Sequence, residues 1–279
     1  MSLPLLSEET RCLVTGSSDP GSIGYACAVA LLQAGAASIT LSGRDSTKLD
    51  LAINSLQEKV TSSTQTIFGV LADLKDPNRM TGAVEEAVSH MGGLDVVVVS
   101  GANGGSEYLG LPADHPDSFQ LLHTISVISP MVLTHAAVKA GATSIVMVSS
   151  MASDVPWPDT APYNTSKAAQ NCLVEQLAFQ YRNQNVRINA VLPACIHSVK
   201  LDVMAEKKGV SVEDYAALRA EVSPMGRNGT VEEVARAVVF LSSSTYSSFT
   251  TGTLFPVDGG LHLSNWWNKP HMLAQYKGL

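Results

Sequence analysis

The chain has 279 residues, which is enough to bury a sizeable core within one α/β domain. Its composition is 45% hydrophobic and 15% charged, as in a compact globular enzyme, and this excludes extended disorder. The net charge of −7 argues against a nucleic-acid or anionic-membrane partner, because both require a basic surface. The nearest basic cluster is the pair Lys207-Lys208, which we interpret as part of a solvated loop. We therefore expect no nucleic acid and no membrane among the partners.

The cysteines and the N-terminus indicate an intracellular protein without a metal site. The four cysteines lie in apolar stretches without CxxC or Cys/His spacing, so we expect buried free thiols in a reducing compartment. The first ten residues, MSLPLLSEET, lack the basic and apolar regions of a signal peptide. No window reaches the roughly 18 apolar residues that a membrane-spanning helix needs. We expect a soluble, cytoplasmic protein that binds no metal.

Short β-rich runs alternate with amphipathic helical windows along the chain. Several runs, such as DVVVV and SIVMV, are nearly all apolar, which is typical of parallel strands covered on both faces. The predicted strands are Arg11–Thr15, Ser38–Ser42, Thr66–Val70, Leu94–Ser100, Thr143–Ser149, Val186–Leu192 and Thr253–Val257. The predicted helices are Ile23–Ala34, Thr47–Val60, Pro77–His90, Ser118–Ala140, Ala161–Asn183 and Val231–Leu241. This order predicts a doubly wound α/β fold, a seven-stranded parallel sheet flanked by helices, as a single domain over residues 1–279.

The longest break in this alternation is the polar stretch Pro193–Ser223, with a helical piece at Val212–Ala220. A connection of this length in a compact domain usually has a function, and we predict a substrate lid at about residues 194–223. Ligands of doubly wound sheets bind at the carboxyl ends of the strands, so functional residues should follow the strands directly.

The glycine-rich segment TGSSDPGSIG, from Thr15 to Gly24, joins the first strand to the first helix. Glycines at this point let the backbone approach a pyrophosphate, while the helix N-terminus offers free N–H groups and a partial positive charge. A glycine-rich turn without a ligand would look the same in isolation. The position between first strand and first helix favours a dinucleotide site.

The second strand ends in LSGRD, where NAD-binding sites usually place an acid that binds the ribose 2′-hydroxyl. That slot holds Gly43, followed by Arg44, whose guanidinium suits a 2′-phosphate and favours NADP(H). The alternative is a surface arginine paired with Asp45. Asp73, after the third strand, is a candidate for the adenine amino group or for a simple helix N-cap.

The candidate catalytic residues follow the fifth strand, which ends at Ser149-Ser150. Tyr163 and Lys167, in YNTSK, are four residues apart and so share one helix face. A cation near a phenol favours phenolate, so the pair can act as a general acid/base, while Ser150 can bind the substrate oxygen. An incidental surface Tyr/Lys pair is the alternative, and the serine and the glycine-rich loop argue against it.

These motifs, together with RINAVLPACIHS and GRNGTVEEVARAVVFLSS…TGTLFPVDGG, resemble the short-chain dehydrogenase/reductase family over essentially the whole chain. The resemblance implies a Rossmann-type homo-oligomer, a tetramer or dimer, that transfers hydride between a nicotinamide cofactor and a substrate carbon. It implies that Tyr163 is the acid/base, that Lys167 holds the nicotinamide ribose and lowers the tyrosine pKa, and that Ser150 positions the carbonyl. The cofactor-binding residues it implies are Gly16, Ser18, Ser22, Ile23, Gly24, Arg44, Asp73, Leu74, Gly101, Asn103, Tyr163, Lys167, Pro193, Ile196 and Ser198.

Four positions depart from the family pattern. The glycine-rich loop carries two extra residues, the NNAG segment reads SGAN at residues 100–103, and PG after the sixth strand reads Pro193-Ala194. The fourth departure is Ser126, which aligns with the asparagine of the catalytic tetrad. We expect the first three to tune cofactor fit, and the fourth to affect the proton relay.

The hypothesis that follows is an NADP(H)-dependent enzyme that interconverts a carbonyl and an alcohol on a mid-sized, largely apolar small-molecule substrate. His197 is a candidate for the pocket wall. Trp157 and Trp266-Trp267 are candidates for the pocket wall and, equally, for a subunit contact. One alternative is an enzyme of the same fold that performs a non-redox isomerisation, dehydration or cyclisation. The other is a nucleotide-binding regulatory protein with a vestigial site.

Overall fold

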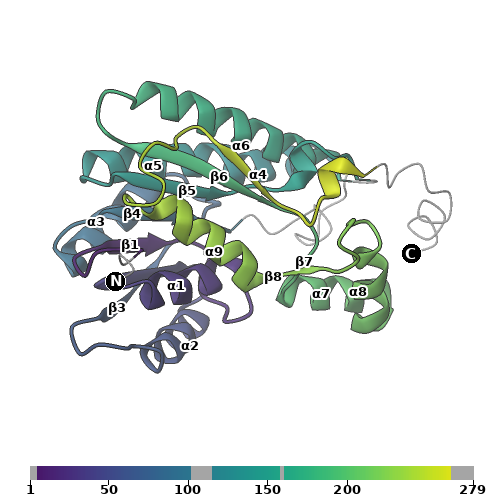
Figure 1. Ribbon diagram of the computed structural model, residues 1–279, viewed down its shortest axis with the longest axis horizontal. Coiled ribbons are helices and arrows are strands. Elements are labelled where there is room, and N and C mark those ends of the chain that lie inside the picture. Colours follow the sequence, from purple (N-terminus) through teal and green to yellow (C-terminus); the bar gives the residue numbers. More distant parts are fainter. Residues whose placement is uncertain (1–4, 102–114, 158–159, 265–279) are drawn as a thin grey trace.

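The computed structural model describes residues 5–101, 115–157 and 160–264. Its centre is a seven-stranded parallel sheet in the order β3-β2-β1-β4-β5-β6-β9 (Figure 1). The predicted doubly wound single-domain sheet is confirmed, and each strand lies within two residues of its expected bounds. The strands are β1 (Arg11–Val14), β2 (Ser38–Gly43), β3 (Thr66–Leu71), β4 (Val96–Val99), β5 (Ser144–Val148), β6 (Arg187–Pro193) and β9 (Leu254–Val257).

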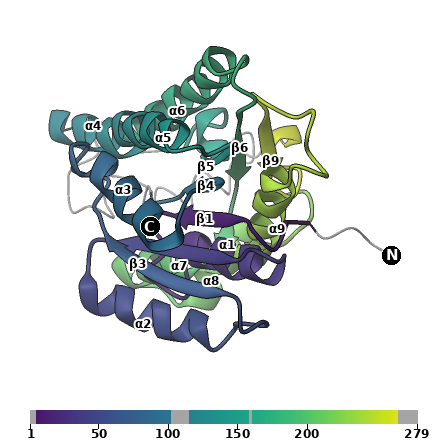
Figure 2. The ribbon, with the colours of Figure 1, turned by 90° about the vertical axis from the view of Figure 1, so that its left-hand side faces the viewer.

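Helices cover both faces of the sheet and bury a separate apolar core on each (Figure 2). One layer holds α1 (Ile23–Gln33), α2 (Ser46–Gln57) and α9 (Val231–Ser242). The other holds α3 (Arg79–Met91), α4 (Pro116–His123), α5 (Ser129–Lys139) and α6 (Ala161–Gln180). Strand order reverses between β1 and β4, which places the ligand-binding crevice at the carboxyl ends of these strands.

Side-chain caps fix where the helices next to this crevice begin. Ser22 accepts a hydrogen bond from the backbone N–H of Tyr25 at the start of α1. Asp45 accepts one from the N–H of Lys48 at the start of α2. Each cap satisfies a backbone donor that the first turn leaves without a partner, so the loops that enter α1 and α2 are held in place.

The helix expected at Ser118–Ala140 is interrupted by a π-helical segment, η2 (Thr124–Ile128), between α4 and α5. Pro130 lies in the first turn of α5 and has no N–H. In an uninterrupted α-helix that N–H would bond the carbonyl of Ser126, so the proline accounts for the change of helix type there. The apolar period continues through this segment, and the predicted helix did not take account of Pro130 in its middle.

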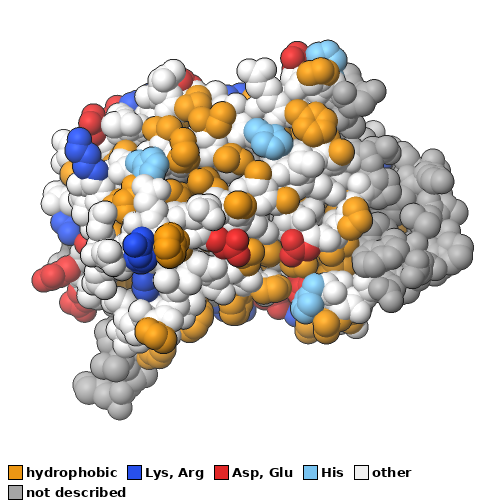
Figure 3. All heavy atoms as spheres, turned by 90° about the horizontal axis from the view of Figure 1, so that it is seen from above, with side chains coloured by type: hydrophobic (Ala, Val, Ile, Leu, Met, Phe, Trp, Pro, Cys, Tyr) orange, Lys and Arg blue, Asp and Glu red, His pale blue; other side chains and the backbone are white. Residues whose placement is uncertain are grey.

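Residues Pro116–Lys139 form one helical run of 24 residues with a mean hydropathy of 1.5, long and apolar enough to cross a membrane. The expectation that no window of the chain reaches this threshold was therefore wrong. In the fold the run packs between α3 and α6, and Leu122 and Leu133 are buried in the core beneath it. Figure 3 looks onto this layer and shows hydrophobic side chains among polar ones on its outer surface. The absence of a membrane partner stays a prediction.

The predicted lid contains more structure than its sequence indicated. It begins with the short strand β7 (Ile196–His197), which pairs with β8 (Gly229–Thr230), and continues as α7 (Val199–Lys208) and α8 (Val212–Ala220). The pair Lys207-Lys208 ends α7 rather than lying in a loop, which corrects that interpretation. Figure 1 shows α7 and α8 together beyond the end of the sheet.

The cysteines carry one further correction. Cys12, Cys27 and Cys195 are buried free thiols as expected, but Cys172 is exposed on α6. Within the described residues, no group of three or more His, Cys, Asp or Glu side chains is placed to hold a metal ion.

Candidate active site

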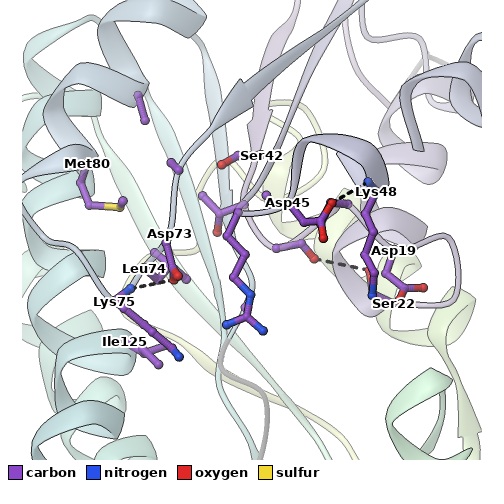
Figure 4. A pocket seen from close by; sticks show the side chains of 18 of the residues that line it. Asp19, Ser22, Ser42, Asp45, Lys48, Asp73, Leu74, Lys75, Met80 and Ile125 are labelled. Carbon is purple, nitrogen blue, oxygen red and sulfur yellow. Dashed lines mark hydrogen bonds between the residues drawn. The ribbon is translucent and has the colours of Figure 1, made fainter. Parts of the chain in front are cut away.

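A cavity of about 220 Å³ opens at the carboxyl ends of β1, β2 and β3. Figure 4 shows Asp19, Ser22 and Lys48 on one side of it and Asp73, Lys75 and Ile125 on the other. Predicted cofactor residues that line it are Gly16, Ser18, Ser22, Arg44, Asp73, Leu74 and Gly101. Lining residues that the sequence analysis did not name as cofactor contacts include Asp19, Ser42, Asp45, Lys48, Lys75 and Ile125.

The glycine-rich loop needs its glycines for two different reasons. Gly16 has a φ of 59°, and a Cβ there would lie 2.5 Å from the carbonyl oxygen of Ser100. Gly24 has no positive φ, but a Cβ there would lie 2.4 Å from the carbonyl oxygen of Gly16. The loop can therefore fold tightly over the ends of β1 and β4 only without side chains at these points. The backbone cradle fits the pyrophosphate of a dinucleotide.

The end of β2 presents two cations to the cavity. Arg44 and Lys48 are both exposed and both line it. Asp45, the alternative partner of Arg44, instead caps α2, and no ion pair joins it to Arg44 among the described residues. Gly43 packs so closely on Ser18 that a Cβ would lie 2.4 Å from its hydroxyl oxygen, so an acid at this slot would not fit.

Asp73 lies in a turn after β3. Its carboxylate accepts a hydrogen bond from the N–H of Lys75 and does not cap α3, whose N-cap is Asn78. The alternative of a plain helix cap is therefore wrong. The next residue, Leu74, is held by α5, because the hydroxyl of Ser129 donates to the carbonyl of Leu74 at 2.6 Å.

The other predicted cofactor residues that the structure describes do not line this cavity. Ile23 and Gly24 form the first turn of α1 behind the loop, and Pro193 is the buried last residue of β6. Ile196 lies in β7, and Ser198 is the N-cap of α7. Asn103 and Trp266-Trp267 lie outside the described residues.

Ser150 and Tyr163 meet at the carboxyl end of β5, where the Ser150 side chain is close enough to act on the pKa of the Tyr163 phenol. Tyr163 lies in the first turn of α6, where burial raises the pKa of its phenol. The Ser150 side chain and the charge of Arg219 lower this pKa, but they do not cancel the effect of burial. The phenol is therefore protonated at neutral pH, ready to donate.

Lys167 lies on the same face of α6, with its Nζ 5.9 Å from the centroid of the Tyr163 ring. Its side chain is 1% exposed and donates hydrogen bonds to the carbonyl of Val148 and to Oε1 of Gln170. Burial, and then the charge of Lys200, lower its pKa to about 7. We predicted that Lys167 lowers the pKa of the tyrosine. The structure differs from this prediction, because burial raises the pKa of Tyr163 by more than any nearby charge lowers it.

Ser126 is fully buried in the π-helical segment η2. The hydroxyl of Ser166, on α6, donates to the Ser126 hydroxyl at 3.3 Å. Ser166 directly precedes Lys167, so Ser126 is linked to the helix that carries the tyrosine and the lysine. In the described part of the chain, no hydrogen bond joins the Ser126 side chain directly to Tyr163 or Lys167.

Two cations of the lid were not anticipated. Lys200, on α7, has its Nζ 5.3 Å from the centroid of the Tyr163 ring. Arg219, on α8, lies 4.6 Å from the centroid of the Trp157 ring. A helical pattern for α7, with Leu201 buried, was the signal that would have revealed the direction of Lys200. His197, the other candidate of this segment, is exposed and lies 3.8 Å from Asp202.

A family model described as enoyl-(acyl carrier protein) reductase matches residues 16–262. The chain belongs to the short-chain dehydrogenase/reductase family. Dehydrogenase/reductase SDR family member 4 of Bos taurus is 33% identical over 253 residues, which cover 89% of this chain and 85% of its own. Glucose 1-dehydrogenase of Gluconobacter oxydans is 29% identical over 271 residues, 92% of this chain and 95% of its own. The resemblance seen in the motifs is confirmed, and the chain is an oxidoreductase of this family.

Solved structures give the same answer for the fold. L-sorbose reductase from Gluconobacter frateurii, in complex with NADPH and L-sorbose, is 25% identical with a TM-score of 0.81, covering 94% of this chain and 100% of its own. An NAD⁺-bound xylitol dehydrogenase is 26% identical with a TM-score of 0.78, covering 90% of this chain and 98% of its own. Similar proteins thus bind either nicotinamide cofactor.

Proposed function

We propose that this protein is an NADP(H)-dependent oxidoreductase that interconverts a carbonyl compound and an alcohol. The observation that carries the proposal is that Ser150 and Tyr163 meet at the carboxyl end of β5, on the edge of the sheet where the dinucleotide cavity opens. The two hydroxyl groups can both donate to one substrate oxygen, which is what carbonyl reduction requires. The expected mid-sized, largely apolar substrate is part of the same proposal.

When bound, the nicotinamide cofactor would supply hydride to the carbonyl carbon, or accept it from the alcohol. The protein's part in reduction is to hold the carbonyl oxygen between Ser150 and Tyr163 and to protonate it. As the new C–H bond forms, the electron pair of the C=O bond moves to oxygen, and the phenol of Tyr163 gives its proton to that oxygen. Solvent then returns a proton to the phenolate. The raised pKa of Tyr163 favours this acid role over the reverse reaction at neutral pH.

The choice of NADP(H) is supported by Arg44 and Lys48, the two exposed cations that line the cavity at the end of β2. A 2′-phosphate placed there would meet two positive charges, and Gly43 leaves no carboxylate at the slot that NAD-binding sites use. Asp45 does not reverse this balance, since it is engaged with the backbone of α2.

We also propose a homo-oligomer, either a dimer or a tetramer. Phe119, Ile128 and Phe179 are exposed on the layer of α4, η2 and α6 that Figure 3 shows. An apolar outer face suits contact with a second copy of the chain. Light scattering after size-exclusion chromatography gives the mass in solution, and a monomer at micromolar concentration would contradict this proposal.

The experiment that tests the function measures NADPH and NADH binding by calorimetry, and then oxidation of each cofactor with a panel of ketones and aldehydes. We expect NADPH to bind more tightly and to be oxidised in proportion to the alcohol formed. Tight binding without any turnover would favour a regulatory protein. Conversion of a substrate without a change in NADPH would favour an isomerase, dehydratase or cyclase.

A further inference from the structure

The lengthened glycine-rich loop contains a tight turn at residues 19–22. The N–H of Ser22 donates to the carbonyl of Asp19 at 2.9 Å, which closes the turn. The Asp19 carboxylate accepts a second hydrogen bond, from the N–H of Gly21 at 3.1 Å. Figure 4 shows Asp19 and Ser22 on one side of the dinucleotide cavity. Pro20 has a fixed φ and Ser22 also caps α1, so the turn is stiff.

This turn contacts the lid at the first residue of α7. The N–H of Val199 donates to the carbonyl of Gly21 at 3.3 Å. An N–H in the first turn of a helix has no acceptor within the helix, so the loop supplies it. The packing is equally close, because a Cβ at Gly21 would overlap Cγ1 of Val199. Glycine at position 21 therefore lets the loop and the lid meet.

The buried side chains of α7 lie outside the two cores of the sheet. Leu201 and Ala205 pack with Tyr215 of α8 in a small cluster of their own. Helix α8 reaches the core of the α3–α6 layer through Leu218. The direction of the first turn of α7 therefore depends on the β7–β8 pair before it and on the contact with Gly21.

Val199 and Lys200 are consecutive, and they face the two ends of the cleft. Val199 lines the dinucleotide cavity. The Nζ of Lys200 lies over the ring of Tyr163, 5.3 Å from its centroid. The Nζ of Lys167, on α6 itself, is 5.9 Å from the same centroid. Different parts of the chain thus position these two ammonium groups: α6 positions Lys167, and the first turn of α7 positions Lys200.

An ammonium group over a phenol ring acts more strongly on the phenolate than on the neutral phenol. With the neutral ring it makes a weak cation–π contact. When Tyr163 gives up its proton, the electron pair of the O–H bond stays behind, and the ring shares the negative charge. The attraction is then one between opposite charges. At pH 7 most Lys200 side chains are charged, because removal from water, and then the charge of Arg219, lower the pKa only to about 8.

We propose that the turn at residues 19–22 positions the lid, through Gly21 and Val199, so that Lys200 stabilises the phenolate of Tyr163 as the substrate oxygen is protonated. The inference rests on the proposed function, in which Tyr163 supplies that proton. Lys200 acts through Tyr163, and Gly21 acts through Lys200, so both are positioning residues. The longer loop then has a role beyond cofactor fit.

The first test measures hydride transfer in a single turnover at pH 7, with saturating NADPH and the carbonyl compound of the panel that the wild type reduces fastest. Lys200→Met should slow this step by about tenfold, the effect of one pKa unit on the phenol. Gly21→Ala should slow it to a similar degree, because the new methyl group displaces Val199 and with it Lys200. The variant with both changes should be no slower than either single variant.

Val199→Ala provides the rescue, because it removes the methyl groups that a side chain at position 21 would overlap. A Cβ at position 21 would then lie 3.4 Å from the Cβ that remains at position 199, an ordinary contact. In the Val199→Ala background, Gly21→Ala should therefore slow the step by about twofold or less. Lys200→Arg keeps the charge and should keep most of the rate. The control is Lys208→Met, which removes a half-buried lysine from the last turn of the same helix and should react like the wild type.

Three results would overturn the inference. One is a wild-type rate in Lys200→Met, and another is a loss in Gly21→Ala that Val199→Ala does not relieve. The third is a loss in Gly21→Ala that adds in full to the loss in Lys200→Met, because the turn would then act on the cofactor and not on Lys200.

Titration of Tyr163 keeps this inference separate from the proposed function, because it needs no substrate. The ultraviolet absorbance of tyrosinate is followed to alkaline pH in Lys200→Arg and Lys200→Met, each corrected with the same variant carrying Tyr163→Phe. Arginine stays charged, so Tyr163 should ionise about one pH unit lower in Lys200→Arg than in Lys200→Met. Adding Gly21→Ala to both should remove the difference.

If no carbonyl compound is reduced but this difference appears and Gly21→Ala removes it, the proposed function fails and the placement of the cation stands. The same ionisation of Tyr163 in Lys200→Arg and Lys200→Met overturns the inference, whether or not a compound is reduced. So does a difference that persists in the presence of Gly21→Ala, because the turn would then not position Lys200.

Discussion

The two ends of the cleft use charge in opposite ways. At the dinucleotide end, Arg44 and Lys48 are exposed, and tight backbone packing at Gly16 and Gly24 shapes the site. At the tyrosine end, Lys167 is 1% exposed, and burial lowers its pKa. An exposed cation keeps its charge and adds affinity for a phosphate, whereas a buried cation holds its own proton less tightly. Cofactor choice should therefore depend on exposed side chains that contribute little to the stability of the fold. The chemistry should depend on buried side chains that destabilise the fold.

The largest expected effect is at the tyrosine end. Tyr163→Phe removes the donated proton but keeps the ring, so turnover should fall by about 10²–10⁴-fold, the contribution of a general acid. The affinity for NADPH should change far less than turnover does. Stopped-flow measurement of NADPH oxidation, with NADPH binding measured in parallel, checks both.

The matched control for this variant is Tyr181→Phe, which removes the phenol that contacts His135 at the other end of α6. It should leave turnover as in the wild type. Retained turnover in Tyr163→Phe would mean that another group supplies the proton, and the non-redox alternative would then be favoured.

The dinucleotide end should give a smaller and more selective effect. Arg44→Ala should weaken the binding of NADPH by about 1.5–3 kcal/mol, the contribution of a charged hydrogen bond, and leave the binding of NADH nearly unchanged. Lys48→Ala should act in the same direction, because both side chains line the cavity. The control for the loss of charge is Arg182→Ala. Arg182 is an exposed arginine between α6 and β6 and does not line the cavity. Equal affinity of the wild type for NADH and NADPH would contradict the assignment.

The dinucleotide end was also the part of the site that could be predicted most fully from the sequence. Tight turns need glycine and parallel strands need apolar runs, so local patterns carry this information directly. Lys200 and Arg219 could not be predicted in the same way, because their meeting at Tyr163 depends on how α7 and α8 fold back over the sheet. The π-helix η2 was missed because the apolar period continues from α4 to α5, although Pro130 in the middle of the predicted helix Ser118–Ala140 was a signal for a break.

Two lysines near Tyr163 predict how stability depends on pH. Their folded-state pKa values, about 7 for Lys167 and about 8 for Lys200, lie below the 10.5 of a free lysine. Between these values the unfolded chain binds more protons, so the free energy of unfolding should rise as pH increases from 7 towards 10. Thermal unfolding of the cofactor-free protein should move up by a few degrees over this range, and by less in Lys167→Met and in Lys200→Met. The same rise in both variants and in the wild type would show that other groups cause it.

The smallest expected effect concerns Ser126, which joins η2 to α6 through Ser166 at 3.3 Å. Ser126→Ala removes one neutral hydrogen bond near Lys167, so turnover should fall by about two- to tenfold without a change in NADPH affinity. Ser126→Asn keeps a polar side chain at this position and should be tolerated. Pro130→Ala is the sharper variant, because it returns the N–H that an α-helix would use to bond the Ser126 carbonyl. If η2 matters through that carbonyl, Pro130→Ala should slow turnover as much as Ser126→Ala does.

The control in the same segment is Thr124→Ala. The hydroxyl of Thr124 donates to the carbonyl of Gln120, on the preceding turn of the same helical run. It should turn over like the wild type. If Ser126→Ala matches the wild type across about pH 6–9, a range that exposes a proton-limited step, Ser126 has no part in the proton path. Slow turnover in Pro130→Ala alone would then assign the role to the backbone of η2, a part that any residue at position 126 can play. This would explain how the chain tolerates serine where the family pattern has asparagine.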